Sequence, residues 1–156
     1  MTPNEFKTYW TSLRVVHGGL MMGVLMFGLI VHFVIQPTQG DTELVQLFNY
    51  IVPGIFVAVV SVSILFLNGR VRRVRDFEEI SDRLDAYRNL SILRWALIEF
   101  ATLFALVTYL LAGDVNLLIL GALGFGYLLL QRPDKNRMVA ELDISNQEVR
   151  EMEVFG

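Results

Sequence analysis

The sequence predicts an all-α membrane protein: an antiparallel bundle of four transmembrane helices, arranged as two hairpins, with a cytoplasmic amphipathic connector helix and a short C-terminal helix. Three observations predict this class. Apolar residues make up 54% of the chain, and its mean hydropathy of +0.50 exceeds that of ordinary soluble domains. The apolar residues gather in four long runs, and the Lys and Arg residues lie at only one end of those runs. The whole chain, residues 1–156, is expected to form a single membrane domain.

The predicted spans are four apolar runs, which lie at about residues 15–35, 45–67, 90–111 and 115–130. Each of the first three is long enough to supply the roughly 20 residues that cross a bilayer. The first ends without a small-residue cleavage site, which indicates a retained helix rather than a signal peptide. The second contains Pro53, which a membrane helix tolerates as a kink. The fourth reaches only about 24 Å at 1.5 Å per residue. It either spans with the help of snorkelling by Gln131 and Arg132 or is a re-entrant or buried segment.

Two polar stretches carry further helical signals. Apolar residues recur at steps of three or four within residues 69–89, which predicts an amphipathic connector helix after the second span. These residues are Val71, Val74, Phe77, Ile80, Leu84 and Tyr87. The tail after Pro133 is polar. Ser145 to Glu148 fits a capping box, which predicts a short final helix to about Glu153.

The distribution of Lys and Arg predicts how the chain is threaded. The turns between paired spans, at residues 36–44 and 112–116, contain neither residue type and carry acidic residues instead. Lys and Arg in short loops stay on the cytoplasmic side of a membrane. Both termini and the connector are therefore predicted to be cytoplasmic, and both turns external. The predicted cytoplasmic segments are residues 1–14, 68–89 and 131–156.

Two short sequence motifs, which we call echoes, occur in both predicted hairpins. Ser-Leu-Arg at residues 12–14 opens the first span, and Ser-Ile-Leu-Arg at residues 91–94 opens the third. Gly-Asp occurs in both external turns, at residues 40–41 and 113–114. A hairpin duplicated in parallel orientation would produce both echoes, and chance similarity of such short segments is the alternative.

Glu99 is a carboxylate inside the third apolar run. An ionisable side chain in hydrocarbon is costly, so Glu99 must be protonated, paired or close to water. One interpretation is a proton or cation site. The other is a structural carboxylate bonded to His17, Arg14 or Arg94. We predict a cross-helix contact from Arg14 and His17, which lie one turn apart in the first span. Arg94 is a poorer partner because five residues separate it from Glu99 by about 140° around one helix.

Glycine spacing predicts sites of close helix packing. Gly19 and Gly23 form a GxxxG pattern, with Gly28 further along the same run. Glycines at such spacing let helix backbones approach each other closely. The pattern fits either a homodimer face or packing inside the bundle, and we favour packing inside the bundle. The same interpretation applies to the glycines of the fourth run, Gly121, Gly124 and Gly126.

Four arginines follow the second span, and they have two interpretations. They are Arg70, Arg72, Arg73 and Arg75. Basic side chains next to a membrane attract anionic lipid head groups by about 1 kcal/mol each. The alternative is a topology signal made of solvated side chains, which we favour.

Composition argues against several classes of function. The chain has no cysteine, so it has no thiolate metal ligand and no cysteine nucleophile. Its two histidines, His17 and His32, are too few for a histidine metal cluster. The net charge is −3 and acids interleave with the basic residues, which argues against a nucleic-acid partner. No catalytic Ser/His/Asp set or nucleotide loop is present. We therefore expect no enzyme activity, no metal and no cofactor.

The chain resembles uncharacterised small four-helix inner-membrane proteins of Gram-negative bacteria. Three segments carry the resemblance: the opening LRVVHGGLMMG, the third span LRWALIEFATLFALVTYLLAG, and the Arg-Pro-Asp-Lys start of the tail. The resemblance covers most of the chain. It implies a bacterial inner (cytoplasmic) membrane location and four spans, and it implies no activity.

A second, local resemblance concerns the third span. Residues 96–107, ALIEFATLFALV, resemble the carboxylate-bearing helix of rotary ATP synthase proteolipids. In that family the acid carries a proton, and the helix runs from the cytoplasm outward. The resemblance implies a proton-carrying role for Glu99.

Three functions follow from these observations as expectations. The first is a non-enzymatic integral membrane protein, an accessory or scaffold subunit that acts through protein partners. The alternative is a proton- or cation-translocating element centred on Glu99. A weaker alternative is a bundle that binds lipid or a small molecule. Expected partners are membrane lipids and either a second copy of the chain or another membrane protein.

Overall fold

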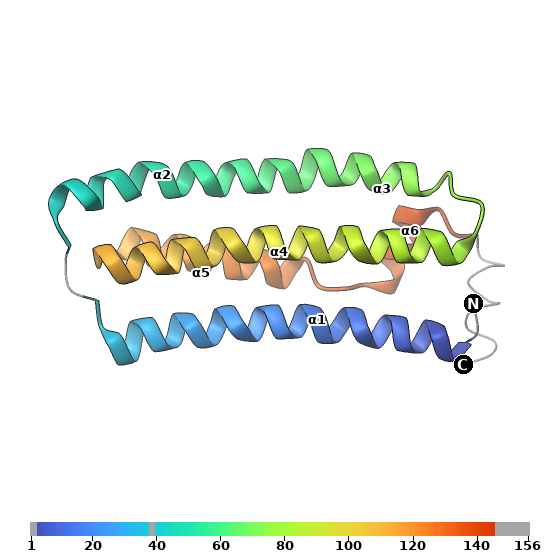
Figure 1. Ribbon diagram of the computed structural model, residues 1–156, viewed down its shortest axis with the longest axis horizontal. Coiled ribbons are helices and arrows are strands. Elements are labelled where there is room, and N and C mark those ends of the chain that lie inside the picture. Colours follow the sequence, from blue (N-terminus) through green and yellow to red (C-terminus); the bar gives the residue numbers. More distant parts are fainter. Residues whose placement is uncertain (1–2, 38–39, 146–156) are drawn as a thin grey trace.

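The computed structural model is helical along nearly all of its described length, and it describes residues 3–37 and 40–145 (Figure 1). No strand occurs among these residues. The elements are α1 (Pro3–Leu29), the π-helical η1 (Ile30–Ile35), α2 (Thr42–Ser61), the π-helical η2 (Val62–Leu67), α3 (Asn68–Val74), α4 (Ile80–Ala112), α5 (Val115–Leu130) and α6 (Lys135–Leu142). The predicted final helix after Ser145 lies outside the described residues.

Helix covers each of the four predicted runs. Three continuous stretches, Phe6–Ile35, Thr42–Val74 and Ile80–Ala112, are long and apolar enough to cross a membrane. The pair α5 and α6 passes the same test together but bends by 74° between the two helices. The described residues therefore contain three stretches capable of spanning, or four if α5 and α6 count as one. Helix α2 continues through Pro53.

The helices are longer than the predicted spans at the end that carries the basic residues. We call this the basic end; it holds the start of α1, the turn at residues 75–79, and α6 (Figure 1). The opposite end, which we call the hairpin end, holds Gly40 and Gly113. There, Gly113 has a φ of 66° and donates its amide to the Tyr109 carbonyl, the usual role of glycine after a helix end. The Gly40 amide donates to the Ala112 carbonyl over 2.9 Å, which joins the two turns.

The prediction of one connector helix over residues 69–89 is wrong. Helix α3 ends at Val74, the chain turns at residues 75–79, and α4 begins at Ile80. Phe77, which completes the predicted apolar stripe, lies in this turn and is 44% exposed. The connector is therefore the extended end of one long helix, a turn, and the extended start of the next.

Hydrogen bonds from two arginines hold this turn. Arg83 Nε donates to the Phe77 carbonyl over 2.6 Å. Arg75 donates to the carbonyls of Glu141 and Ala140 over 2.6 and 3.2 Å. Arg75 thus ties the turn to the C-terminal end of α6. The Arg75 contacts join parts of the chain that are 65 and 66 residues apart, and the spacing of apolar residues does not encode them.

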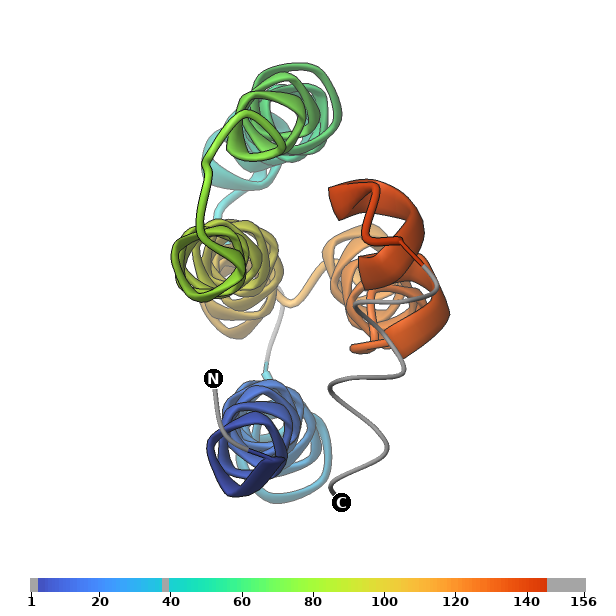
Figure 2. The same ribbon diagram turned by 90° about the vertical axis from the view of Figure 1, so that its right-hand side faces the viewer.

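Helix α4 lies at the centre of the arrangement. Helices α1 and α2 lie on opposite sides of α4, and α5 packs against a third side (Figure 2). Helices α1 and α4 run in one direction, while α2 and α5 run in the other (Figure 1). Helices α1 and α2 pack mainly on α4 rather than on each other. The two parallel helices, α1 and α4, are the ones that open the predicted repeats.

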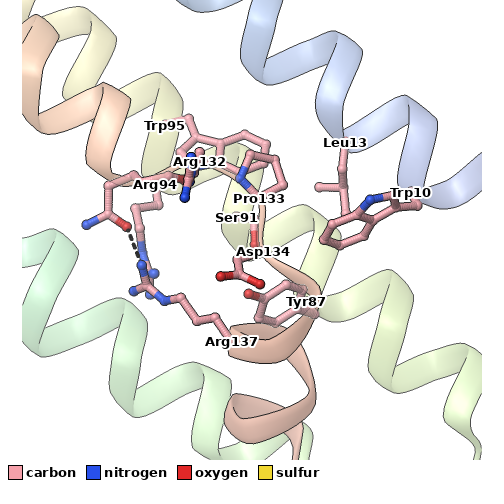
Figure 3. A pocket seen from close by; sticks show the side chains of 11 residues that line it. Trp10, Leu13, Tyr87, Ser91, Arg94, Trp95, Arg132, Pro133, Asp134 and Arg137 are labelled. Carbon is pink, nitrogen blue, oxygen red and sulfur yellow. Dashed lines mark hydrogen bonds between the residues drawn. The ribbon is translucent and has the colours of Figure 1, made fainter. Parts of the chain in front are cut away.

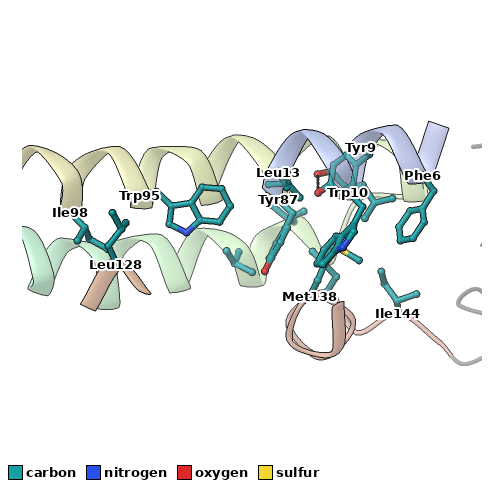
Figure 4. Close-up of a cluster of buried hydrophobic side chains, with 14 residues drawn as sticks. Phe6, Tyr9, Trp10, Leu13, Tyr87, Trp95, Ile98, Leu128, Met138 and Ile144 are labelled. Atoms are coloured by element: carbon teal, nitrogen blue, oxygen red, sulfur yellow. Dashed lines mark hydrogen bonds between the residues drawn. The ribbon is translucent and has the colours of Figure 1, made fainter. Parts of the chain in front are cut away.

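The larger of the two buried apolar clusters lies at the basic end (Figure 4). It brings together the start of α1, the start of α4, and α6, and it includes Trp10, Leu84 and Met138. The second cluster lies at the hairpin end and includes Val31, Val52, Ala105, Tyr109, Ala112 and Leu117. Outside a bilayer the hydrophobic effect favours burial, whereas between lipid-facing helices it does not. Most of the larger cluster lies beyond the predicted spans, and three of its members, Trp95, Ile98 and Leu128, lie within them.

The tail after Pro133 contains a helix that the sequence analysis does not predict. Asp134 caps α6 by accepting the Asn136 amide over 2.9 Å. Met138 and Leu142 face inward and are almost fully buried. Two apolar residues four apart after an Asp are a weak helix signal in a polar segment, and the surrounding cluster supplies the rest of the stabilisation.

Candidate functional site

Glu99 lies on the face of α4 that looks toward α1 and α5. Its Oε1 atom would lie 3.8 Å from a Cβ placed on Gly23 of α1. Leu106, seven residues along α4 and so on the same face, contacts Gly28 of α1 and Gly121 of α5. Glu99 is partly buried. A glycine at position 23 leaves room for the carboxylate beside α1.

The predicted contact of Glu99 with Arg14 and His17 is wrong. Among the described residues, Glu99 has no hydrogen bond or ion pair to Arg14, His17 or Arg94. Because α1 and α4 run parallel, the residue level with Glu99 is Gly23. His17 lies six residues earlier, about 9 Å along the helix axis. The position of each residue along the helix axis, rather than its charge, therefore determines which residue of α1 lies beside Glu99.

His17 is buried and serves to join helices. Its Nε2 atom lies 3.0 Å from the carbonyl oxygen of Leu128 in α5. A carbonyl oxygen only accepts, so Nε2 carries the hydrogen. The ring also meets Trp95 of α4 edge-on, with centroids 4.8 Å apart. His17 therefore connects α1 to both α4 and α5.

Arg94 faces the other side of α4 and is only 7% exposed. It donates to Asn68 Oδ1 over 2.7 Å, which links α4 to α3. Its Nε atom and the Nε1 atom of Trp10 are buried without a hydrogen-bond partner. Both side chains line a polar pocket at the basic end, together with Tyr87 and Arg137 (Figure 3). The open space in this pocket is about 20 Å³, the size of a single water site.

Arg14 is exposed and lies over the indole ring of Trp10, with 5.4 Å from Cζ to the ring centroid. This is a cation–π contact within one helix. The structure thus separates the four residues of the predicted polar network. Arg14, His17, Arg94 and Glu99 face different neighbours and share no hydrogen bond among the described residues.

The predicted packing glycines divide into two groups. Gly23 and Gly28 face α4, whereas a Cβ on Gly19 would meet nothing within 4 Å. Among the described glycines, two of those in α5 leave the least room for a side chain. A Cβ on Gly121 would lie 2.7 Å from Leu106, and one on Gly124 would overlap Thr102 and the ring of Phe56. The GxxxG pattern at residues 19–23 is therefore not a pair of close contacts within the chain.

The four arginines after the second span also differ among themselves. Arg72 and Arg73 are exposed in α3, as a lipid contact or a solvated topology signal requires. Arg75 is bound to the α6 carbonyls and so belongs to the structural contacts of the turn. Arg70 is exposed as well. Exposure therefore fits both interpretations for Arg70, Arg72 and Arg73, and only Arg75 is set apart by its contacts.

Two polar contacts at the hairpin end are absent from the predicted set. His32 Nδ1 lies 3.0 Å from the Tyr109 hydroxyl, which links η1 to α4. Asn49 donates to Asp114 Oδ2 over 2.7 Å, which links α2 to the start of α5. The side-chain hydrogen bond from Asn49 and the backbone one from Asn116 lower the pKa of Asp114. The sequence near each of these residues does not predict its partner, because the partners come from distant segments.

No group of three or more His, Cys, Asp or Glu side chains in the described part of the chain is placed to hold a metal ion. The features that remain for a functional site are Glu99, the basic end with its cations, and the exposed faces of α1 and α2. Comparison of the chain with protein-family models, curated proteins and solved structures gave no match.

Proposed function

We propose that the protein is a non-enzymatic integral membrane protein of the bacterial inner membrane, which acts as an accessory or scaffold subunit through other membrane proteins. In this proposal the four long helices form a transmembrane bundle. The stretches capable of spanning support the insertion, and the Lys and Arg residues support a cytoplasmic basic end. Both termini then lie in the cytoplasm.

The observation that carries the scaffold proposal is an unpartnered face of small residues on α2. Gly54, Ala58 and Ser61 are exposed at helical spacing, and a Cβ on Gly54 would meet nothing within 4 Å. The most apolar 18-residue window of the α2 stretch is only 18% buried, against 50% for that of α4. Small residues at this spacing are the usual contact surface between membrane helices. A transmembrane helix of a partner protein, or of a second copy, fits this face.

Photo-crosslinking in native membranes tests the scaffold proposal. A benzophenone amino acid replaces Val57, which neighbours this face and is 63% exposed. We expect a discrete protein adduct whose partner mass spectrometry identifies. The Gly54→Leu variant should lose the adduct, because the larger side chain keeps a partner helix away. The matched control is Gly126→Leu in α5, where a Cβ also meets nothing within 4 Å, and it should keep the adduct. Lipid adducts alone would contradict the proposal.

A second function is favoured by one observation: Glu99 has no hydrogen bond or ion pair to the basic side chains predicted to neutralise it. In hydrocarbon an unpaired carboxyl is far less costly in its neutral form. A neutral carboxyl that reaches water from time to time can carry a proton. The second candidate is therefore a proton- or cation-translocating element centred on Glu99, in which His17 has only a structural role.

Labelling with a hydrophobic carbodiimide tests the second candidate. This reagent attacks protonated carboxyls that are open to lipid. Folded protein should be labelled at Glu99, and the labelling should decline as the pH rises. The Glu99→Gln variant is the control and should remain unlabelled. Absence of labelling in the folded wild-type protein would count against a protonatable, lipid-accessible site.

A further inference from the structure

A groove opens at the basic end between α1 and the segment that joins α5 to α6. Its volume is about 570 Å³. Three cationic side chains line it: Arg14 from α1, and Arg132 and Lys135 from the joining segment. All three are exposed. The groove also contains one carboxylate, Asp134, which caps α6. Positive charge therefore exceeds negative charge in this groove.

Two of the three cations, Arg14 and Lys135, contact an aromatic ring rather than a carboxylate. Arg14 lies over one ring, that of Trp10, at 5.4 Å, and Lys135 lies 6.0 Å from the centroid of the same ring. Within the described residues, Arg14, Arg132 and Lys135 form no ion pair. Contact with an aromatic ring orders Arg14 and Lys135 without neutralising their charge. The charge of the groove remains available to an anion.

The position of the groove along the helices fits the head-group layer of a membrane, an argument that rests on the membrane insertion proposed above. Arg14 precedes Ile35, the last residue of the first helical stretch, by 21 residues, or about 32 Å at 1.5 Å per residue. That length is close to the roughly 30 Å of a hydrocarbon core. Arg132 follows the last residue of α5 by two positions. Both cations therefore lie at the level of cytoplasmic-leaflet head groups.

A second, apolar groove lies along the seam between α1 and α5, nearer the hairpin end, beyond the contact of His17 with the Leu128 carbonyl. This second groove has a volume of about 220 Å³. Val24 and Gly28 of α1, Gly121 and Phe125 of α5, and Leu106 of α4 line it. Val24 lies ten residues beyond Arg14, about 15 Å along the axis, which is half of a hydrocarbon core. An acyl chain of one leaflet spans that distance.

We propose that this seam binds one anionic phospholipid. Arg14, Arg132 and Lys135 hold the phosphate of its head group, and one acyl chain lies between α1 and α5 along the apolar groove. The excess of cations selects an anionic over a zwitterionic head group. The separation of the two grooves matches the distance from a phosphate to the lower part of an acyl chain.

Titration of the delipidated, detergent-solubilised protein, followed by native mass spectrometry, tests this proposal. The probes are phosphatidylglycerol and phosphatidylcholine with identical acyl chains, and inorganic phosphate alone. We expect preferential binding of phosphatidylglycerol. Removal of two charges in Arg14→Gln/Arg132→Gln should weaken it roughly thirty-fold, at about 1 kcal/mol for each charge. The control Arg88→Gln removes one charge from α4 outside the groove lining, and it should bind like the wild-type protein, whereas the single-charge variant Lys135→Gln should not.

The possible outcomes are separable. Equal binding of both lipids by the wild-type protein, or an equal loss in the control, would overturn the proposal. Displacement of the lipid by millimolar phosphate alone would replace it with a free-anion site. If the double variant does not fold, Lys135→Gln should still weaken binding about five-fold, and unchanged binding would overturn the proposal. Alkaline extraction of membranes from wild-type cells tests insertion separately. Release of the protein overturns the membrane proposal too, whereas retention without lipid preference overturns only this site.

Discussion

At the scale of single residues, two ionisable side chains in apolar helices are accommodated in different ways. His17 donates to a backbone carbonyl at the end of α5 and packs on Trp95. Glu99 occupies space left by Gly23 and, among the described residues, has no hydrogen bond to a basic side chain. His17 therefore contributes to stability through its contacts, whereas Glu99 lacks contacts of this kind.

This contrast predicts opposite effects of two substitutions. His17→Leu removes the bond to the Leu128 carbonyl and the ring contact, and should lower the stability by about 1 kcal/mol. Glu99→Gln keeps the shape and removes no partner, so the melting temperature in detergent should stay unchanged. Thermal unfolding of both variants checks this. An equal loss in Glu99→Gln would show that its carboxylate is bonded after all.

A second residue-scale prediction concerns pH and the bond between Asn49 and Asp114. The hydrogen bonds of Asp114 favour its charged form and lower its pKa below the ordinary value of 3.8. Their contribution to stability is therefore fully present above pH 3.8 and is lost as the pH falls through the lower folded-state pKa. The protection of the α2 amides near Asn49 against hydrogen exchange, taken relative to the intrinsic exchange rate at each pH, should fall in that acid range.

The matched variant for the pH prediction is Asn49→Ala. It removes one of the hydrogen bonds that lower the pKa of Asp114. Exchange near position 49 should then be faster already at neutral pH and should depend less on acid. A wild-type profile that is flat between about pH 5 and pH 2 would contradict the assignment.

At the scale of elements, α4 and α5 pack closely at Gly124. Gly124 of α5 faces Thr102 and Phe56. Thr102 is held in place because its hydroxyl donates to the Ile98 carbonyl over 2.7 Å. Three helices, α2, α4 and α5, therefore meet at a position where only glycine fits.

Gly124→Ala should accordingly destabilise the protein by about 1–3 kcal/mol, the usual cost of overpacking. The control is Gly126→Ala on the same helix, where a Cβ meets nothing within 4 Å. There, the better helix propensity of alanine should leave the stability unchanged or raise it by up to about 1 kcal/mol. Denaturation in detergent measures both. Equal effects of the two variants would argue against the close contact.

At the scale of the whole molecule, the register of the two parallel helices is consistent from end to end. Residues of α1 and η1 meet residues of α4 that lie about 77 positions later. The pairs are Tyr9 with Leu84, His17 with Trp95, Gly28 with Leu106, and His32 with Tyr109. Parallel orientation is what a duplicated hairpin requires. Helices α2 and α5, the second helices of the two hairpins, are not equivalent. Helix α5 packs closely on α4, whereas α1 and α2 lie on opposite sides of α4 (Figure 2).

The proposed threading predicts the accessibility of single cysteines, and the chain has no native cysteine to interfere. Glu43 and Glu78 are exposed near opposite ends. In spheroplasts, a membrane-impermeant maleimide should label Glu43→Cys directly and Glu78→Cys only after permeabilisation. The reverse pattern would invert the orientation. Equal labelling of both without permeabilisation would argue against a membrane between them.

Sequence patterns alone determined which segments are helical over the four apolar runs and where the basic residues gather. Both are local properties, because they depend on the hydropathy of each run and on the positions of Lys and Arg in the sequence. The same patterns missed α6 and the break at residues 75–79. In those places the local signal is weak, and the contacts of Met138, Leu142 and Arg75 decide the structure.

Only the tertiary structure decided which residues face each other. Charge pointed to a contact of Glu99 with His17 and Arg14, but the parallel register places Gly23 beside Glu99 and the Leu128 carbonyl beside His17. That register depends on close contacts between segments tens of residues apart, such as Gly28 with Leu106. Apolar helices have nearly the same hydropathy along their length, so hydropathy does not determine which residues lie at the same level. Steric fit between the helices does.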